Sequence, residues 1–305
     1  MPRIDIGGLS LNYQDEGKGE PLLLIPGLMG LLDAWDFQVA HFKKRYRCIR
    51  FDHRGTGDSD KPKDAYSTRL IAKDAVGLLN ALGIEKAHVI GTSTGGAILQ
   101  NLAIDHPERL ISCIFCNTWT TADEYIRRVQ TSRMRIAESY GPEEYIKFSS
   151  LWTCGPNQFR YDWEKIQAIE TRQKRTIAPV DVLVGRLRMT LEHNRISELR
   201  RIDRPSLVIG TEDDPTVPGY FAGDLHKAIK ASRLHMMKEG GHYSYRRRHR
   251  EFNAVVEKFL KQQSTRGKAA AKRAKTRPAK ARVKRKSGLR RRGTCVLMPR
   301  AKTAT

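Results

Sequence analysis

The segment Gly91-Thr92-Ser93-Thr94-Gly95-Gly96 follows a short apolar run, Lys86–Ile90, and opens a helical pattern that continues to His106. A continuous apolar run with β-branched residues is typical of a strand that is buried on both faces. The sequence therefore predicts a strand, a sharp turn that carries Ser93, and a helix. Such a turn needs small residues two positions before and after the serine, and Gly91 and Gly95 supply them. A glycine-rich turn with an incidental serine is the alternative interpretation.

Apolar runs of the same kind recur along the chain and alternate with helical patterns. They cover residues 21–25, 47–51, 110–116 and 205–209. Alternation of strand and helix predicts an open α/β sheet, which binds ligands at the carboxyl ends of its strands. The stretch from Ile4 to Asp15 is expected to add antiparallel strands at one edge. Residues 118–200 show helical patterns without a strong strand run, so we expect a helical cap there, inserted between two strands.

A serine hydroxyl becomes a good nucleophile only beside a base, and the base needs an acid that orients it. The acid is expected after the strand at 205–209, where Asp213 and Asp214 are adjacent. The spacing from Asp214 to Pro218 favours Asp214, and Asp213 is the alternative. His242 follows the next strand pattern on a glycine-rich loop, so it is the predicted general base.

Attack on a carbonyl creates an oxyanion, which needs backbone N–H donors to stabilise it. The predicted donors are the amide of Thr94, directly after the serine, and the amide of Leu28 in the loop Pro26–Gly30. A simple Pro-Gly turn is the alternative interpretation of that loop. In the segment Asp52–Ser59, we expect glycines at tight turns and Arg54 in a structural role.

The net charge of +23 is concentrated at one end of the chain. Residues 262–305 contain 16 Lys and Arg and no Asp or Glu, so residues 1–261 carry only about +7. The Lys/Arg/Ala-rich composition of this tail predicts disorder. A solvated extension and weak binding of a polyanion such as nucleic acid are the two interpretations of the tail.

Several classes of protein are disfavoured by the rest of the sequence. No apolar run approaches the roughly 18 residues of a membrane helix, and the start of the chain lacks the pattern of a signal peptide. The five cysteines are an odd number without framework spacing, which favours a reducing, cytoplasmic setting. Cys113 and Cys116 are expected to be buried, inert thiols. No metal or cofactor is expected, and the oligomeric state is left open.

Together these motifs resemble the α/β-hydrolase superfamily over residues 1–261. The resemblance rests on five motifs: Pro26-Gly27, Asp52–Ser59, the turn at Ser93, Asp214 with Pro218, and Gly241-His242. It implies a mostly parallel eight-stranded sheet formed by residues 1–117 and 201–261, with the cap at 118–200. The segment Asn117-Thr118-Trp119 is most similar to the branch of 3-oxoadipate enol-lactonases and aminoacrylate hydrolases. Pro26 and Thr94 replace residues that are common in the family, but neither change removes a backbone donor.

The predicted function is hydrolysis of a small carboxylic ester, lactone or activated amide. Ser93 would be the nucleophile, His242 the base and Asp214 the orienting acid. The alternatives are a C–C bond hydrolase of a dienoic diketone on the same fold, a non-catalytic binding scaffold, and a polyanion-binding protein with a vestigial hydrolase body.

Overall fold

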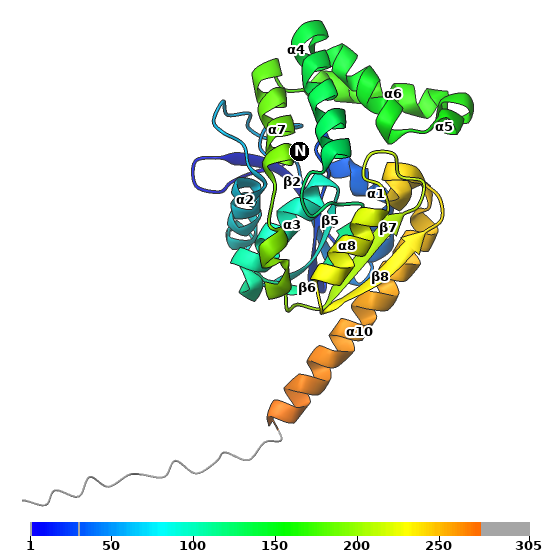
Figure 1. Ribbon diagram of the computed structural model, residues 1–305. Coiled ribbons are helices and arrows are strands. Elements are labelled where there is room, and N and C mark those ends of the chain that lie inside the picture. Colours follow the sequence, from blue (N-terminus) through cyan, green and yellow to red (C-terminus); the bar gives the residue numbers. More distant parts are fainter. Residues whose placement is uncertain (1, 30, 276–305) are drawn as a thin grey trace, which may run out of the picture. The chain divides into compact units, whose positions relative to one another are not determined.

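The computed structural model describes residues 2–29 and 31–275, and its centre is an eight-stranded sheet in the order β1-β2-β4-β3-β5-β6-β7-β8 (Figure 1). The strands are β1 (Arg3–Asp5), β2 (Ser10–Glu16), β3 (Glu20–Ile25), β4 (Tyr46–Phe51), β5 (Ala87–Thr92), β6 (Leu110–Cys116), β7 (Ser206–Thr211) and β8 (Ser232–Met237). Pairing is antiparallel from β1 to β2 and from β2 to β4, and parallel across the rest. The predicted sheet, with antiparallel strands at one edge, is confirmed.

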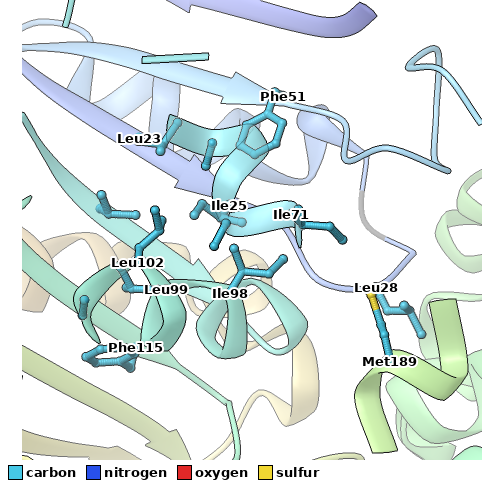
Figure 2. Packing of buried hydrophobic residues seen from close by; sticks show 14 of the residues in the cluster. Leu23, Ile25, Leu28, Phe51, Ile71, Ile98, Leu99, Leu102, Phe115 and Met189 are labelled. Carbon is cyan, nitrogen blue, oxygen red and sulfur yellow. The ribbon is translucent and has the colours of Figure 1, made fainter. Parts of the chain in front are cut away.

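Helices cover both faces of the sheet. Successive side chains along each strand point to opposite faces, so a strand that is covered on both faces contributes to two buried clusters. In β3, Leu23 and Ile25 belong to one buried cluster, whereas Leu22 and Leu24 belong to the other. The first cluster includes residues of α2 (Thr68–Ala81), α3 (Thr94–Asp105) and α8 (Tyr220–Ala228). The second includes residues of α1 (Asp36–Phe42) and α10 (His249–Lys275). Figure 2 shows Leu23 and Ile25 beside Ile98, Leu99 and Leu102 of α3.

Four α-helices lie between β6 and β7 in the chain, where the sequence predicts a cap. They are α4 (Glu124–Thr153), α5 (Pro156–Tyr161), α6 (Trp163–Thr176) and α7 (Val180–Glu192). Figure 1 shows them in green, grouped at one end of the sheet. Helix α4 is interrupted at Gly141, which has a φ of 84°. Pro142 follows, at the first turn of the second segment, where a missing N–H costs little. The boundaries at 118 and 200 stay a prediction.

The basic segment 262–305 lies only partly within the described residues. Helix α10 continues to Lys275 and so includes its first part, whereas residues 276–305 lie outside the described residues. Disorder and polyanion binding of residues 276–305 stay predictions. Within the described ranges, no helix is both long and apolar enough to cross a membrane.

Cys113 and Cys116 lie in β6, the strand beside β5, and both are fully buried and free. Burial raises the pKa of each thiol to about 12, so neither forms the reactive thiolate at neutral pH. The prediction that both thiols are buried is confirmed, and their inertness stays a prediction.

His193 connects the end of the cap helices to the helices that cover the sheet. Its Nδ1 lies 2.9 Å from Thr68 Oγ1, and its Nε2 lies 3.1 Å from Gln100 Oε1. Because the Gln100 amide donates to the carbonyl of Trp119, its oxygen faces the histidine and accepts a hydrogen bond from Nε2–H. Burial, together with the nearby Arg195, lowers the pKa of His193 to about 4.

We expect His193 to make the protein less stable in acid. Since its pKa falls from about 6.5 in the unfolded chain to about 4 in the folded one, unfolding takes up a proton between these values. The contribution of neutral His193 to the free energy of unfolding is complete above pH 6.5. It is lost as the pH falls toward 4, and the loss reaches up to about 3 kcal/mol. The free energy of unfolding is measured by denaturant titration of wild type and His193→Gln between pH 4 and 7. Its slope against pH should be smaller in the variant, by an amount that corresponds to the uptake of up to about one proton. Equal slopes would contradict this assignment.

Candidate active site

Ser93 lies in a strained turn between β5 and α3, with φ of 54° and ψ of −121°. A positive φ is rare for residues other than glycine and is held only where the surrounding structure enforces it. The turn requires its glycines, because a Cβ at Gly91 would overlap the carbonyl oxygen of Gly95. A Cβ at Gly95 would overlap the carbonyl oxygen of Ile25 in β3. The predicted strand–turn–helix unit is confirmed, and it presents Ser93 at the carboxyl end of β5.

His242 lies on the loop after β8, and its Nδ1 is 2.8 Å from Oδ2 of Asp214. Both side chains are buried, with 5% of His242 and 4% of Asp214 exposed. The other carboxylate oxygen of Asp214 accepts hydrogen bonds from the N–H groups of Thr216 and Val217, at 2.8 and 2.9 Å. These bonds fix the carboxylate, so Asp214 can hold the imidazole with Nδ1–H donating and Nε2 available to accept a proton.

Asp213 has a different position from its neighbour. Its carboxylate accepts hydrogen bonds from the N–H groups of Gly240 and Gly241, at 3.2 and 2.8 Å. Both glycines have a positive φ, of 127° and 59°, so this loop bends sharply just before His242. The structure therefore brings Asp214 to the imidazole and places Asp213 beneath the loop that carries it.

The two predicted oxyanion donors line the same cavity as Ser93. Thr94 is the first residue of α3, where backbone N–H groups have no partner within the helix. Leu28 follows β3, and its carbonyl accepts a hydrogen bond of 2.9 Å from the guanidinium of Arg186. Among the described residues, neither the Leu28 nor the Thr94 amide has an acceptor. Both amides are therefore available to a bound oxyanion.

The cavity above Ser93 has an empty volume of about 640 Å³, including solvent at its mouth. Ser93, His242 and the loop at Gly27–Met29 form its floor. Helix α4 adds Ile126, Val129, Gln130 and Arg133, and other segments add Trp119, Val217 and Tyr243. On the cap side the lining is therefore mixed, with apolar side chains beside the polar side chains of Gln130 and Arg133.

The segment Asp52–Ser59 has the structural role that the sequence predicts. Arg54 forms a two-point ion pair with Asp74 of α2, with N–O distances of 2.6 and 2.5 Å. The Asp52 carboxylate accepts hydrogen bonds from the N–H groups of Leu32 and Asp58. These contacts fix the loop between β4 and α2.

Asn117 contacts the loop that carries His242, a role that the sequence motifs do not predict. Its φ is 43°, and its side-chain amide lies 3.2 Å from the carbonyl of Gly241 and 3.3 Å from that of His242. Its side-chain oxygen accepts a hydrogen bond from Thr211 at the end of β7. Asn117 therefore ties the end of β6 to the histidine loop. An asparagine directly after a strand run is a signal for a positive φ, but it does not identify the partner.

Replacing Asn117 should lower activity by loosening the histidine loop. We expect kcat to fall about 10-fold in Asn117→Gly, because the amide donors to this loop are lost while glycine tolerates the positive φ. Asn117→Ala should lose a similar factor in kcat and more thermal stability, because alanine is strained at this φ. Steady-state kinetics and thermal unfolding of both variants check this. Full activity in Asn117→Gly would show that the loop needs no such tie.

Known proteins that resemble this chain show its family. A family model described as "alpha/beta hydrolase fold" matches residues 20–137, and one described as "TAP-like protein" matches residues 188–270. The "Putative carbamate hydrolase RutD" of Azorhizobium caulinodans is 32% identical over 79% of this chain and 91% of its own. Human "Serine hydrolase BPHL" is 30% identical over 85% of each chain.

The solved structures that match include the enol-lactonase from Burkholderia xenovorans LB400. Its TM-score is 0.80 and it is 24% identical, covering 85% of this chain and all of its own. At this identity the likeness concerns the fold. Within the described part of the chain, no cluster of His, Cys, Asp and Glu could hold a metal ion. The fold, the strained serine turn and the similarity to named hydrolases agree, and the chain belongs to the α/β-hydrolase family and is a hydrolase.

Proposed function

We propose that this enzyme hydrolyses a small carboxylic ester, lactone or activated amide through a covalent acyl intermediate on Ser93. One observation carries the proposal: Ser93 and His242 line one cavity, and His242 is held from behind by the buried carboxylate of Asp214 at 2.8 Å. A serine, an imidazole and a carboxylate in these positions supply a nucleophile, a base and the group that orients the base.

In the first half of the reaction, Ser93 Oγ attacks the substrate carbonyl while His242 Nε2 accepts the serine proton. The oxyanion is stabilised by the N–H groups of Leu28 and Thr94, and the positive end of helix α3 contributes. His242 then gives its proton to the departing alcohol or amine, and the C–O or C–N bond breaks. In a lactone, the departing alcohol stays attached to the acyl group.

In the second half, His242 removes a proton from water, and the hydroxide attacks the acyl group on Ser93. The same N–H groups stabilise the second oxyanion. The proton then returns to Ser93 Oγ as the acyl bond breaks and the carboxylic acid leaves. Throughout, Asp214 keeps the imidazole in one tautomer and stabilises its positive charge when it is protonated.

A substrate panel tests which bond is cleaved. We expect purified enzyme to hydrolyse short-chain 4-nitrophenyl esters, small lactones or anilides, and to leave the C–C bond of a dienoic diketone intact. Ester hydrolysis should fall by at least about 10⁴-fold in Ser93→Ala, which controls for contaminating esterases. Cleavage of the dienoic diketone with a higher kcat/KM than any ester would favour the C–C hydrolase on the same fold.

A further inference from the structure

Arg186 is a fully buried cation of helix α7, beside the loop that carries the Leu28 amide. One of its terminal nitrogens donates to the carbonyl of Leu28 at 2.9 Å, and the other donates to the carbonyl of Arg54. Leu28 follows β3 and Arg54 follows β4, so a single guanidinium joins α7 to two loops. Because the guanidinium is rigid and planar, it fixes how the three segments lie against one another.

The charge of Arg186 is buried without a carboxylate partner among the described residues. Two other buried arginines do have acidic partners: Arg54 pairs with Asp74, and Arg195 pairs with Asp105. Burying a charge is costly, and replacing a buried charge by an apolar side chain is often neutral for stability. A need for stability therefore does not explain a cation at this position, so its role lies in the groups that it holds.

His53 is the third group that the guanidinium contacts, and it lies just after β4, next to Arg54. Its Nδ1 is 3.4 Å from a terminal nitrogen of Arg186. Burial and the positive charge of Arg186 hold the pKa of His53 well below its usual range, so its imidazole is neutral. A neutral imidazole can accept a hydrogen bond at Nδ1. The two carbonyls and this nitrogen together fix the plane of the guanidinium.

The main chain around Leu28 depends on this contact. Among the described residues, the bond from Arg186 is the only hydrogen bond to the main chain of residues 27–29. The amide and the carbonyl of one residue are joined through its Cα, with only two rotatable backbone bonds between them. A guanidinium that holds the Leu28 carbonyl therefore restricts the direction of the Leu28 N–H, and Leu28 lines the cavity together with Ser93.

We propose that Arg186 is a positioning residue for hydrolysis: from α7 it holds the Leu28 peptide in the orientation in which its N–H stabilises the oxyanion. This rests on the proposed function, since the oxyanion is taken to form at Ser93. An oxyanion donor acts mainly as the charge develops, so its orientation affects the transition state more than the bound substrate. Arg186 does not line the cavity above Ser93, so it acts through Leu28 and does not touch the substrate.

A split between kcat and KM tests this role first. Arg186→Met keeps a side chain of similar shape but removes every donor. Loss of a whole oxyanion donor costs about 10²- to 10³-fold in kcat, and we expect a misdirected donor to cost about 10- to 100-fold. KM should change by less than about 3-fold, because the interaction that is lost forms mainly in the transition state. A wild-type kcat in Arg186→Met overturns the proposal.

A conservative variant keeps the test open if Arg186→Met does not fold. Arg186→Lys keeps the charge but lacks the planar fork that reaches two carbonyls. We expect it to lose about 3- to 10-fold in kcat, less than Arg186→Met, because one carbonyl can still be held. If only Arg186→Lys folds, a wild-type kcat in this variant overturns the proposal.

A second buried arginine provides the control for a general loss of stability. Arg195 donates to Asn101 and Asp105 of α3 and lines none of the three cavities near the site. Arg195→Met should lower the melting temperature and leave kcat within about 3-fold of wild type. A loss of kcat in Arg195→Met as large as that in Arg186→Met would show a merely structural effect and overturn the proposal.

Inhibitors that do and do not form an oxyanion give a readout that a structural role would not move. The probes are a trifluoromethyl ketone with the acyl chain of the best 4-nitrophenyl ester, and the matched methyl ketone. In the first, Ser93 Oγ bonds to the carbonyl carbon, the serine proton passes to His242, and the carbonyl oxygen becomes the oxyanion. We expect Arg186→Met to weaken inhibition by the trifluoromethyl ketone about 10- to 100-fold and by the methyl ketone less than about 3-fold. Equal weakening of both overturns the proposal.

Amide hydrogen exchange separates this proposal from the proposed function, because it needs no turnover. In the segments that follow β3 and β4, the N–H groups of Leu32, Gly55 and Thr56 each donate to an acceptor within the protein. We expect Arg186→Met to raise the exchange rates of these amides by about 5-fold or more and to leave those of β7 unchanged. Unchanged exchange in both segments refutes the anchoring by Arg186. Faster exchange in a protein that hydrolyses no ester refutes the proposed function and leaves the anchoring in place.

Discussion

Ser93→Ala is expected to lower kcat/KM for the preferred ester by at least about 10⁴-fold, because the acyl intermediate can no longer form. A residual rate above that of water would come from the oxyanion donors and from substrate binding. The fold should survive, since the substitution removes only the hydroxyl group. The surrounding structure already holds residue 93 at a φ of 54°. Steady-state kinetics on wild type and variant, with thermal unfolding of both, measure this.

A matched control separates the missing nucleophile from a general effect of losing a buried serine. Ser112 lies in β6, next to β5, and its hydroxyl is 2.7 Å from Nδ1 of the buried His88. Ser112→Ala should lower the free energy of unfolding by about 1 kcal/mol and change kcat/KM by less than about 5-fold. A loss in Ser112→Ala as large as that in Ser93→Ala would mean that the assay reports on folding.

Asp214→Asn is expected to lower kcat by about 10³- to 10⁴-fold. The amide either presents its NH₂ group to Nδ1 or leaves the imidazole without a negative partner, and both outcomes disfavour the tautomer that accepts the serine proton. KM should change little, because Asp214 lies behind His242 and outside the lining of the cavity. Steady-state kinetics with a saturating ester give both constants.

The neighbouring aspartate provides the control for this prediction. Asp213 supports Gly240 and Gly241 through hydrogen bonds, and Asp213→Asn keeps one oxygen that can accept such a bond. We expect it to lose less than about 10-fold in kcat. A larger loss in Asp213→Asn than in Asp214→Asn would reverse the roles of the two carboxylates.

The sheet and the serine turn could be predicted from the sequence because their signals are local. Continuous apolar runs such as Leu22–Ile25 specify strands that are buried on both faces, and glycine spacing specifies the turn at Ser93. The fold then fixes where strands end, so Asp214 and His242 could be placed at the same edge from their positions after β7 and β8.

The sequence favours Asp214 over Asp213 but does not decide between them, because both residues follow the same strand. The Asp214 side chain reaches the imidazole, whereas the Asp213 side chain reaches two backbone amides. This difference depends on the direction of each side chain in a tight turn. Local pattern does not specify that direction.

Asn117 and Arg186 were out of reach of the sequence for a different reason. The partners of Asn117 are the carbonyls of residues 241 and 242, which lie far away in the chain and come close only in the folded sheet. The partners of Arg186 are likewise the distant carbonyls of residues 28 and 54, and periodicity does not tell which arginine of α7, Arg186 or Arg188, is buried. Both roles depend on tertiary contacts between segments that are distant in sequence.

Labelling by a fluorophosphonate probe, read by mass spectrometry, tests most directly whether Ser93 is the activated nucleophile. The predicted tryptic peptide of residues 87–109 contains Ser93 as its only serine, so the labelled residue can be identified without ambiguity. We predict one adduct per chain, on this peptide in wild type, and none in Ser93→Ala. An adduct on another peptide, or equal labelling of wild type and Ser93→Ala, would contradict the assignment of Ser93 as nucleophile.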